Sequence, residues 1–381
     1  SRARKTPPER IAPAVVRNIL AIRDQPPEGL NRVPGPRTIL YYLHQDEALR
    51  QSGLKLPTST STIWHILDQN QRIARPSRVP HQPIDRPEPM QVWEIDFCDI
   101  STVPPVPEGK QQHVVEAFNV VDRGTSIWVE TAVQADYHAE TAVVAVLSTL
   151  MVHGMPQRVI MDRDPRLIGS GSSEGYPSAL MRMLLSLGIG MTICPPRQPQ
   201  RKPVVERLQR TIKYEAVRIE RPATLEAARD LLDKQSMFYN TDRPNQATVC
   251  DNQPPYVAFP TLPQLPRLPE RIDPDGWLRA YHNHELKRRI TSNGTIAVGK
   301  YRYYIGRRWA GRVVALRIDA HHKQLRVVAP HDIDKVLDIK GLYHGEMAFE
   351  EYVKLILEEA RAEWRRLRHQ RRWKTISPGI A

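Results

Sequence analysis

The first 75 residues contain three short stretches whose apolar residues recur every three or four positions. Residues 13–23 and 37–49 show this spacing, and Pro13 and Pro36 stand where a helix would begin. A third stretch covers 60–69, after a run of hydroxyl residues suited to capping a helix. Its apolar residues Ile63, Ile66 and Leu67 fall on one side. The pattern therefore predicts three short helices with a shared core.

After a proline-rich segment at 76–91, the pattern changes to strands. Residues 92–100 alternate, with Trp93, Ile95 and Phe97 on one side and Glu94, Asp96 and Cys98 on the other, which we interpret as the outward face. Strands are also expected at 112–121 and 126–133. Helices and strands then alternate: helix 137–152, strand 157–161, helix 178–187, strand 189–194 and a helix starting at Pro203. This order matches an RNase H-like α/β fold over 92–250.

The pattern of the last part of the chain predicts three further segments. We expect a linker and helical connector over 251–290, and short strands punctuated by glycines in a small β-barrel over 291–340. Residues 341–381 would form a C-terminal helix with a basic tail. The predicted fold class is therefore multidomain α/β, with a helical domain at 1–75 and a linker at 76–91 before the core.

The composition of the chain indicates that its partner is a polyanion. The net charge is +13 and the isoelectric point is about 9.7. Residues 361–374 carry seven Lys or Arg, including Arg365 and Arg368, and residues 197–218 carry seven more, including Arg201 and Lys202. Such clusters, interleaved with aromatic residues, favour nucleic acid over a merely solvated helix face. The helices of 1–75 then suggest a helix-turn-helix domain that places Thr62 and His65 in the major groove, unless they form a bundle with no DNA role.

Other features narrow the class of protein. Three widely spaced cysteines exclude a disulfide framework and a cysteine zinc site, and indicate a reducing compartment. No stretch has the roughly 20 apolar residues of a membrane span, so we expect a cytoplasmic protein without a membrane partner. The opening SRARKTPPER lacks both a Met and an apolar signal segment, which suggests a trimmed piece of a longer chain.

Three carboxylates stand at positions where the predicted fold would gather them. Asp96 lies on the first strand, Asp162 follows the strand ending in RVIM, and Glu206 is in the first turn of the helix that begins at Pro203. Carboxylates among cations suit Mg²⁺ or Mn²⁺, and two ions about 4 Å apart would promote in-line phosphoryl transfer. Glu206, Arg210 and Lys213 share one helix face, which would let the two cations contact DNA phosphates. An ordinary solvated Glu–Arg pair is the alternative for that face.

Four segments together resemble the core of DDE transposases and retroviral-type integrases, including bacterial insertion-sequence and Tn7- or Mu-like transposases. They are QVWEIDFCDI, RVIMDRDPRLIG, ICPPRQPQRKPVVERLQRTIKYE and FYNTDRPNQA. In that family a Trp precedes the first Asp by three positions, as Trp93 precedes Asp96, and a Lys follows the Glu by seven, as Lys213 follows Glu206. The resemblance covers residues 90–260. It also fits a helix-turn-helix domain before the core and a β-barrel after it.

The resemblance implies a bacterial, nucleoid-associated DNA transposase that frees a 3′ end at the transposon end and joins it to target DNA. It implies that Asp96, Asp162 and Glu206 hold two Mg²⁺ or Mn²⁺ ions. It further implies a dimer or tetramer that synapses two ends, and an AAA+ ATPase that docks on the C-terminal part. A catalytically decayed DNA-binding regulator and a nuclease without strand transfer are the rival functions.

The sequence departs from the family pattern near the second and third carboxylates. Arg163, Asp164 and Pro165 follow Asp162, and the interval to Glu206 is longer than usual, with the Gly/Ser-rich tract 169–175 as the expected insertion. Asp164 is therefore a minor rival to Asp162. Asp99 is a weaker rival to Asp96, because strand alternation places the two on opposite faces.

Overall fold

The structure is a computed structural model that describes residues 11–27, 33–73, 84–101, 114–169, 175–195, 201–328 and 333–376. The chain divides into two compact units, Ser1–Pro83 and Ile84–Ala381. The first half of the predicted linker 76–91, the centre of the predicted insertion 169–175 and part of the basic cluster 197–218 lie outside the described residues. Within the described ranges, none of the helices is both long and apolar enough to cross a membrane.

The N-terminal unit is a small helical domain. Its helices are α1 (Pro13–Asp24), α2 (Pro36–Gln45), α3 (Glu47–Gln51) and α4 (Thr60–Gln69). The stretch predicted as one helix over 37–49 is two helices, because the Asp46 side chain accepts a hydrogen bond from the backbone N–H of Leu49 and starts α3. Val15, Ile19, Ile39, Leu43, Ile63 and Leu67 form its fully buried core. The inward face predicted for the helix over 60–69, which is α4, is confirmed.

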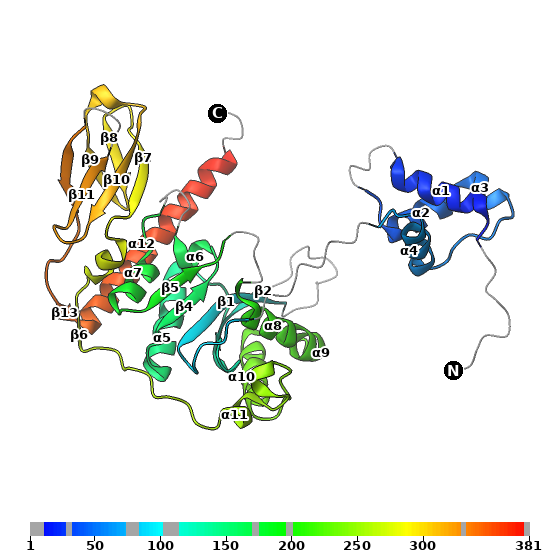
Figure 1. Ribbon diagram of the computed structural model, residues 1–381, viewed down its shortest axis with the longest axis horizontal. Coiled ribbons are helices and arrows are strands. Elements are labelled where there is room, and N and C mark those ends of the chain that lie inside the picture. Colours follow the sequence, from blue (N-terminus) through cyan, green and yellow to red (C-terminus); the bar gives the residue numbers. More distant parts are fainter. Residues whose placement is uncertain are drawn as a thin grey trace. The chain divides into compact units, whose positions relative to one another are not determined.

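A mixed five-stranded sheet forms the centre of the second unit (Figure 1). Its strands are β1 (Val92–Ser101), β2 (Val114–Asp122), β3 (Trp128–Gln134), β4 (Arg158–Met161) and β5 (Gly190–Ile193). They lie in the order β3-β2-β1-β4-β5. The first three strands are antiparallel neighbours, whereas β1, β4 and β5 run parallel. The predicted strands all form, within a few residues of their expected bounds.

Helices cover both faces of this sheet. On one face lie α5 (Ala139–His153), α6 (Pro165–Ile168), α7 (Ala179–Ser186) and the long α12 (Phe349–Ile376). The other carries α8 (Pro203–Thr211), the π-helical turn η3 (Ile212–Val217) and α10 (Leu225–Thr241), with α9 (Arg218–Glu220) joining the last two. Trp93 and Ile95 pack toward the first layer, and Ile100 and Ala117 toward the second. The face of β1 interpreted as outward is therefore covered by α8, and Glu94 and Cys98 are buried there.

The short element η4 (Thr248–Cys250) and α11 (Pro255–Ala258) follow α10, and an extended segment then leads to the C-terminal region. There β6 (Arg271–Ile272) pairs with β13 (Met347–Ala348), and η5 (Gly276–Tyr281) follows β6. Tyr352, Ile356 and Ala360 of α12 are buried in the main core. The C-terminal helix is thus an integral part of the second unit over much of its length.

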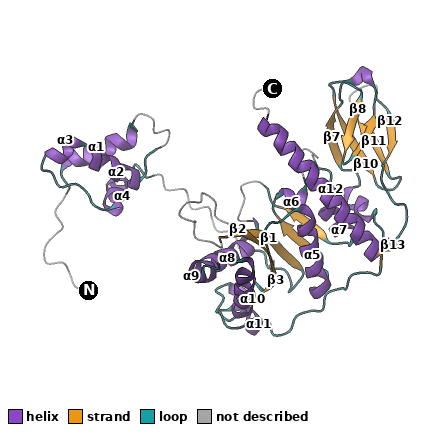
Figure 2. Ribbon diagram, turned by 180° about the vertical axis from the view of Figure 1, so that it is seen from behind, coloured by secondary structure: helices purple, strands orange, loops and turns teal. Residues whose placement is uncertain are grey.

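The small β-domain contains a four-stranded sheet in the order β12-β11-β10-β7 and a hairpin of β8 and β9 (Figure 2). The strands are β7 (Glu285–Arg289), β8 (Thr295–Val298), β9 (Tyr301–Tyr304), β10 (Val313–Asp319), β11 (Gln324–Val328) and β12 (Lys335–Asp338), with the turn η6 (Arg307–Trp309) between β9 and β10. Their alternate apolar residues form one core, which includes Leu286, Leu316 and Leu325. Strand β7 belongs to this domain, although the sequence analysis placed its residues in the connector 251–290.

Candidate active site

The two aspartates lie at one end of neighbouring parallel strands. In the register of β1 and β4, Val92 is opposite Arg158 and Glu94 is opposite Ile160, so Asp96 lies two residues further on, beside Asp162. The side chain of Asp96 is 14% exposed and that of Asp162 is 40% exposed. Glu206 stands in the first turn of α8, which packs over β1 and β2. The three predicted carboxylates therefore come from adjacent elements.

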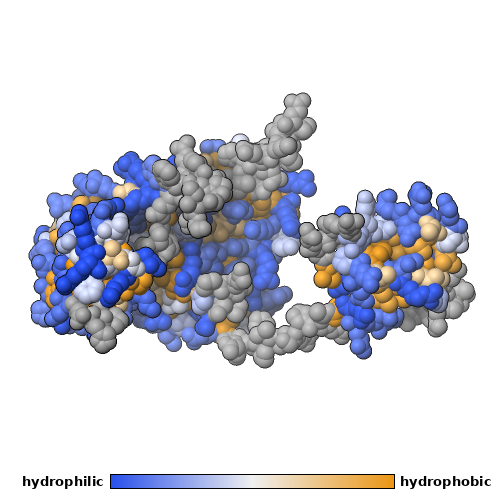
Figure 3. Space-filling model, turned by 90° about the horizontal axis from the view of Figure 1, so that it is seen from above, coloured by the Kyte–Doolittle hydropathy of each residue, from blue (hydrophilic) through white to orange (hydrophobic). Residues whose placement is uncertain are grey.

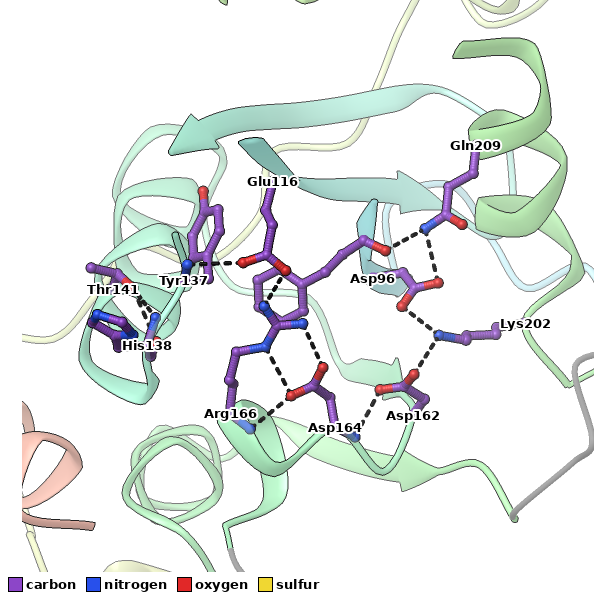
Figure 4. A network of polar contacts seen from close by, with 11 residues as sticks. Asp96, Glu116, Tyr137, His138, Thr141, Asp162, Asp164, Arg166, Lys202 and Gln209 are labelled. Carbon is purple, nitrogen blue, oxygen red and sulfur yellow. Dashed lines mark hydrogen bonds and ion pairs between the residues drawn. The ribbon is translucent and has the colours of Figure 1, made fainter. Parts of the chain in front are cut away.

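A lysine joins the two aspartates. The Nζ atom of Lys202 lies 2.6 Å from Oδ1 of Asp96 and 3.2 Å from Oδ2 of Asp162 (Figure 4). Its side chain is only 8% exposed. Lys202 was predicted to contact DNA; in this structure its ammonium group is turned inward, where it neutralises part of the charge of the two carboxylates.

Burial and charge oppose each other at this site. Burial raises the pKa of Asp96, although Lys202 and a hydrogen bond from Gln209 act to lower it. Burial also raises the pKa of Glu206, and the negative charge of Asp96 contributes to that rise while Lys202 counteracts it. For Lys202, burial lowers the pKa, but the two aspartates outweigh burial and the result is a pKa above the ordinary value. The electrostatic influence of Asp96 on Glu206 links the helix carboxylate to the aspartate pair.

The aspartate pair has the chemistry of a divalent-cation site. Two carboxylates converge on a single cation, and Mg²⁺ is commonly held by one or two carboxylates together with substrate phosphates. No group of three histidine, cysteine or carboxylate side chains among the described residues is arranged to hold a metal ion. Asp96 and Asp162 thus fit Mg²⁺ or Mn²⁺, whereas Glu206 is not in place as a third ligand.

The orientations of both aspartates are set by neighbouring groups. The side-chain amide of Gln209 donates to Oδ2 of Asp96 at 2.9 Å and to the carbonyl of Phe97 at 3.0 Å. The backbone N–H of Asp164 donates to Oδ1 of Asp162 at 3.0 Å. Each carboxylate is therefore held by one donor besides Lys202.

The rival aspartates have other roles. Asp164 caps α6 and binds the guanidinium of Arg166, whose Nη2 lies 2.6 Å from Oδ2. Arg166 also pairs with Glu116 and lies 4.0 Å above the ring of Phe97, as part of the network in Figure 4. Asp164 is thus already neutralised. Asp99 is exposed, away from the aspartate pair.

A second buried carboxylate, Glu94, fixes the position of α8, although it was not predicted as a site residue. Glu94 is fully buried and accepts hydrogen bonds from the backbone N–H groups of Val204 and Val205, both at 2.9 Å. Its other oxygen lies 2.5 Å from Nη1 of Arg123. Burial raises the pKa of Glu94, while the backbone donors and Arg123 counteract the rise. Because α8 carries Glu206, this contact ties Glu206 to the strand that carries Asp96. The alternation that puts Glu94 on the same face as Asp96 was the available signal.

The predicted DNA-contacting residues fall into three groups. Arg201, Arg210 and Lys213 are exposed at or along α8 and η3. In the N-terminal unit His65 is exposed, and Thr62 is half-buried and bonded to the helix cap at Ser59. The third group comprises Arg365 and Arg368, exposed on α12. Figure 3 shows hydrophilic residues over much of the visible face of the molecule.

The apolar spacing of the Glu206 helix predicts a buried stripe of five residues, Val205, Leu208, Ile212, Ala216 and Ile219. The first four are buried, but Ile219 is 67% exposed. The π-helical turn η3 contains Ile212 and Ala216 and ends just before Ile219. A π turn takes one more residue than an α turn, so it rotates the following residues relative to the stripe.

One segment of the second unit matches a known protein family. Residues 187–255, which include α8 and Glu206, match the family model of the integrase core domain. The matched segment is thus similar to the integrase core found in DDE transposases and integrases. An integrase core domain implies a metal-dependent polynucleotidyl transferase that acts in DNA integration or transposition.

Two solved structures of retroviral proteins are similar to this chain at low sequence identity. An intasome of simian T-cell lymphotropic virus, in complex with the PP2A regulatory subunit B56 gamma, is 15% identical. That match covers 80% of this chain and 97% of the other, with a TM-score of 0.37. The HTLV-2 integrase catalytic core with magnesium, in a trimeric form, is 12% identical; the match covers 46% of this chain and 99% of that one, with a TM-score of 0.33. No curated protein matches the sequence.

Proposed function

We propose that this protein is a DNA transposase that cleaves at transposon ends, frees a 3′-OH and joins it to target DNA. The observation that carries the proposal is the convergence of Asp96 and Asp162 on one cation position beside the helix of Glu206, and that helix lies in the segment that matches the integrase core. The net charge of +13 is in keeping with DNA as the substrate.

Asp96 and Asp162 are proposed to hold metal in the arrangement seen here, and Glu206, which is not in place as a third ligand in this structure, is proposed to join them when metal is bound. Bound Mg²⁺ or Mn²⁺, in a pair of ions, would supply activation of the attacking oxygen and stabilisation of the leaving oxygen in phosphoryl transfer. Gln209 and the backbone of Asp164 orient the two aspartates, and Glu94 holds the start of α8 against β1. The residues of the chain thus hold in position the carboxylate side chains that come from β1, β4 and α8.

The exposed cations would position the DNA. Arg201, Arg210 and Lys213 lie on or just before the helix that carries Glu206, so a phosphate backbone bound there would run close to the carboxylates. Thr62 and His65 on α4 are proposed to contact the transposon end in the major groove. Arg365 and Arg368 on α12 offer a further phosphate-binding surface.

A joining assay tests the proposal. The full chain would be incubated with Mg²⁺, a supercoiled plasmid and a short duplex that the chain itself has selected from a random-sequence pool. Joined duplex and plasmid would support a transposase. Nicks without joining would indicate a nuclease, and selective binding with neither product would indicate a DNA-binding regulator. Asp96→Asn and Glu206→Gln should each abolish joining; joining that survives either change would refute the site assignment.

The multimer and the ATPase partner are also proposals. A dimer or tetramer on DNA would be detected by light scattering of the complex with the selected duplex.

An AAA+ partner is tested by deletion of part of the basic tail, which should abolish recruitment of the ATPase and spare binding of the duplex. The structure shows where the chain can be shortened. Glu363 and Trp364 pack on the core, so a deletion from residue 361 would disturb the fold, whereas deletion of 372–381 leaves these contacts in place. Loss of duplex binding in the shortened chain would mark the tail as a DNA contact instead.

A further inference from the structure

Lys202 is a buried lysine that lies directly beside the two carboxylates proposed to bind metal. It precedes α8 as its N-cap residue, with φ −127° and ψ 59°, and its carbonyl accepts a hydrogen bond from the N–H of Glu206 at 3.3 Å. Because its backbone lies outside the helical conformation, its side chain does not follow the exposed face of Arg210 and Lys213. The side chain instead runs inward to the ends of β1 and β4.

The ammonium group of Lys202 and a divalent ion would use the same carboxylate oxygens. Oδ1 of Asp96 and Oδ2 of Asp162 both lie within ion-pair distance of Nζ, and the remaining oxygens of the two aspartates accept from Gln209 and from the backbone of Asp164. All four oxygens of the pair are therefore engaged by the chain itself. A metal ion that binds both aspartates has to displace at least one of these donors, and only the ammonium group carries a full positive charge that would repel it.

We propose that Lys202 is an internal counter-cation that holds the aspartate pair closed to metal until it is displaced. The inference rests on the proposed metal-binding role of Asp96 and Asp162. With Lys202 in place the three groups have a net charge of −1; once it leaves, the aspartates present −2 to an incoming ion. The lysine therefore lowers the affinity of the DNA-free protein for Mg²⁺ and Mn²⁺.

A DNA phosphate would compete with the two aspartates for the ammonium group of Lys202. Lys202 is flanked by Arg201 and lies four residues before Glu206, at the end of α8 nearest the aspartates. A phosphate at this end would attract the ammonium group away from the carboxylates and so favour metal binding. By thermodynamic linkage, metal binding would strengthen the hold on DNA by the same factor.

The test is a titration of the full chain with Mn²⁺, in which electron paramagnetic resonance measures the free ion. The variants are Lys202→Met, which removes the charge, Lys202→Arg, which keeps it, and Lys234→Met, which makes the same change on the exposed face of α10. Asp96→Asn identifies the binding that belongs to the site. We expect Lys202→Met to bind Mn²⁺ at least tenfold more tightly than the wild type, with Lys202→Arg and Lys234→Met within about twofold of it.

A random-sequence duplex added to the titration tests the coupling. It should tighten Mn²⁺ binding to the wild type severalfold and have a smaller effect on Lys202→Met. If binding sensitive to Asp96→Asn exists but has the same affinity in Lys202→Met as in the wild type, the counter-cation role is refuted and the metal site stands. If no variant shows such binding, the metal site and the inference both fail.

A crystal structure of the wild type soaked in Mn²⁺ gives an answer that does not depend on how the variants fold. The inference expects Nζ of Lys202 to lie beyond ion-pair distance of at least one aspartate. Mn²⁺ bound to both carboxylates, with both lysine contacts retained, would overturn it.

Discussion

Replacement of Glu94 by Gln tests whether this buried carboxylate holds α8 in position. Glu94 accepts two backbone hydrogen bonds from the start of α8 and pairs with Arg123 while fully buried. A glutamine has one acceptor oxygen, so its NH₂ group must face either the two backbone donors or the guanidinium. Each buried donor left without an acceptor costs roughly 1–3 kcal/mol, and loss of one partner from a buried ion pair costs about 3–5 kcal/mol. We expect Glu94→Gln to lower the free energy of opening of α8 by about 3 kcal/mol.

Hydrogen exchange measured by mass spectrometry reads this effect locally. At about 1.4 kcal/mol per factor of ten, the amides of 203–211 should exchange about a hundredfold faster in Glu94→Gln when opening limits exchange. Glu220→Gln makes the same chemical change at an exposed site on α9 and should leave the rate within a few-fold. If the amides of α8 exchange at the wild-type rate in Glu94→Gln, the positioning role of Glu94 is wrong.

Three further predictions follow from the ion pairs and exposed cations. Arg166→Ala leaves Asp164 and Glu116 without their guanidinium, and should lower the urea midpoint of the core transition by an amount equivalent to about 3–5 kcal/mol; an unchanged midpoint would contradict the network in Figure 4. Arg182→Met removes the buried guanidinium shared by Glu359 and Glu363, of which Glu359 keeps its ion pair with Lys300, so exchange of the α12 amides should rise while α4 stays unchanged. Arg210→Ala and Lys213→Ala should each reduce by about 1 the slope of log binding constant against log salt, measured by fluorescence anisotropy with a random-sequence duplex; an unchanged slope would remove that residue from the DNA surface.

The parts of the site that could be predicted are those that depend on periodicity and element order. Alternation placed Asp96 opposite the core residues Trp93 and Ile95, and the strand before Asp162 was clear from its apolar run. The parallel pairing of β1 and β4 then makes the two aspartates neighbours. Residues 203–211 also read as a helix, which put Glu206 in its first turn.

The parts that could not be predicted depend on where single side chains turn. Lys202 belongs to a basic cluster, so composition favoured a phosphate contact; only its position as a helix N-cap directs it to the aspartates. Glu94 was read as solvent-facing because alternation cannot tell a solvated face from one covered by a second helical layer. Ile219 lost its place in the stripe through a π turn, which leaves no periodic signal in the sequence. Strand β7 was missed because its residues, ELKRR, are mostly charged.

The most direct test of the central claim is metal rescue of an aspartate variant in the joining assay. Thiolate ligands favour softer ions over Mg²⁺, whereas carboxylates suit both Mg²⁺ and Mn²⁺. If Asp96 is a metal ligand, the wild type should join the selected duplex to plasmid with either ion. Asp96→Cys should be inactive with Mg²⁺ and regain joining with Mn²⁺, while Asp96→Ala should be inactive with both. Equal joining by Asp96→Cys in the two metals, at the wild-type level, would contradict the assignment of Asp96 as a ligand in DNA strand transfer.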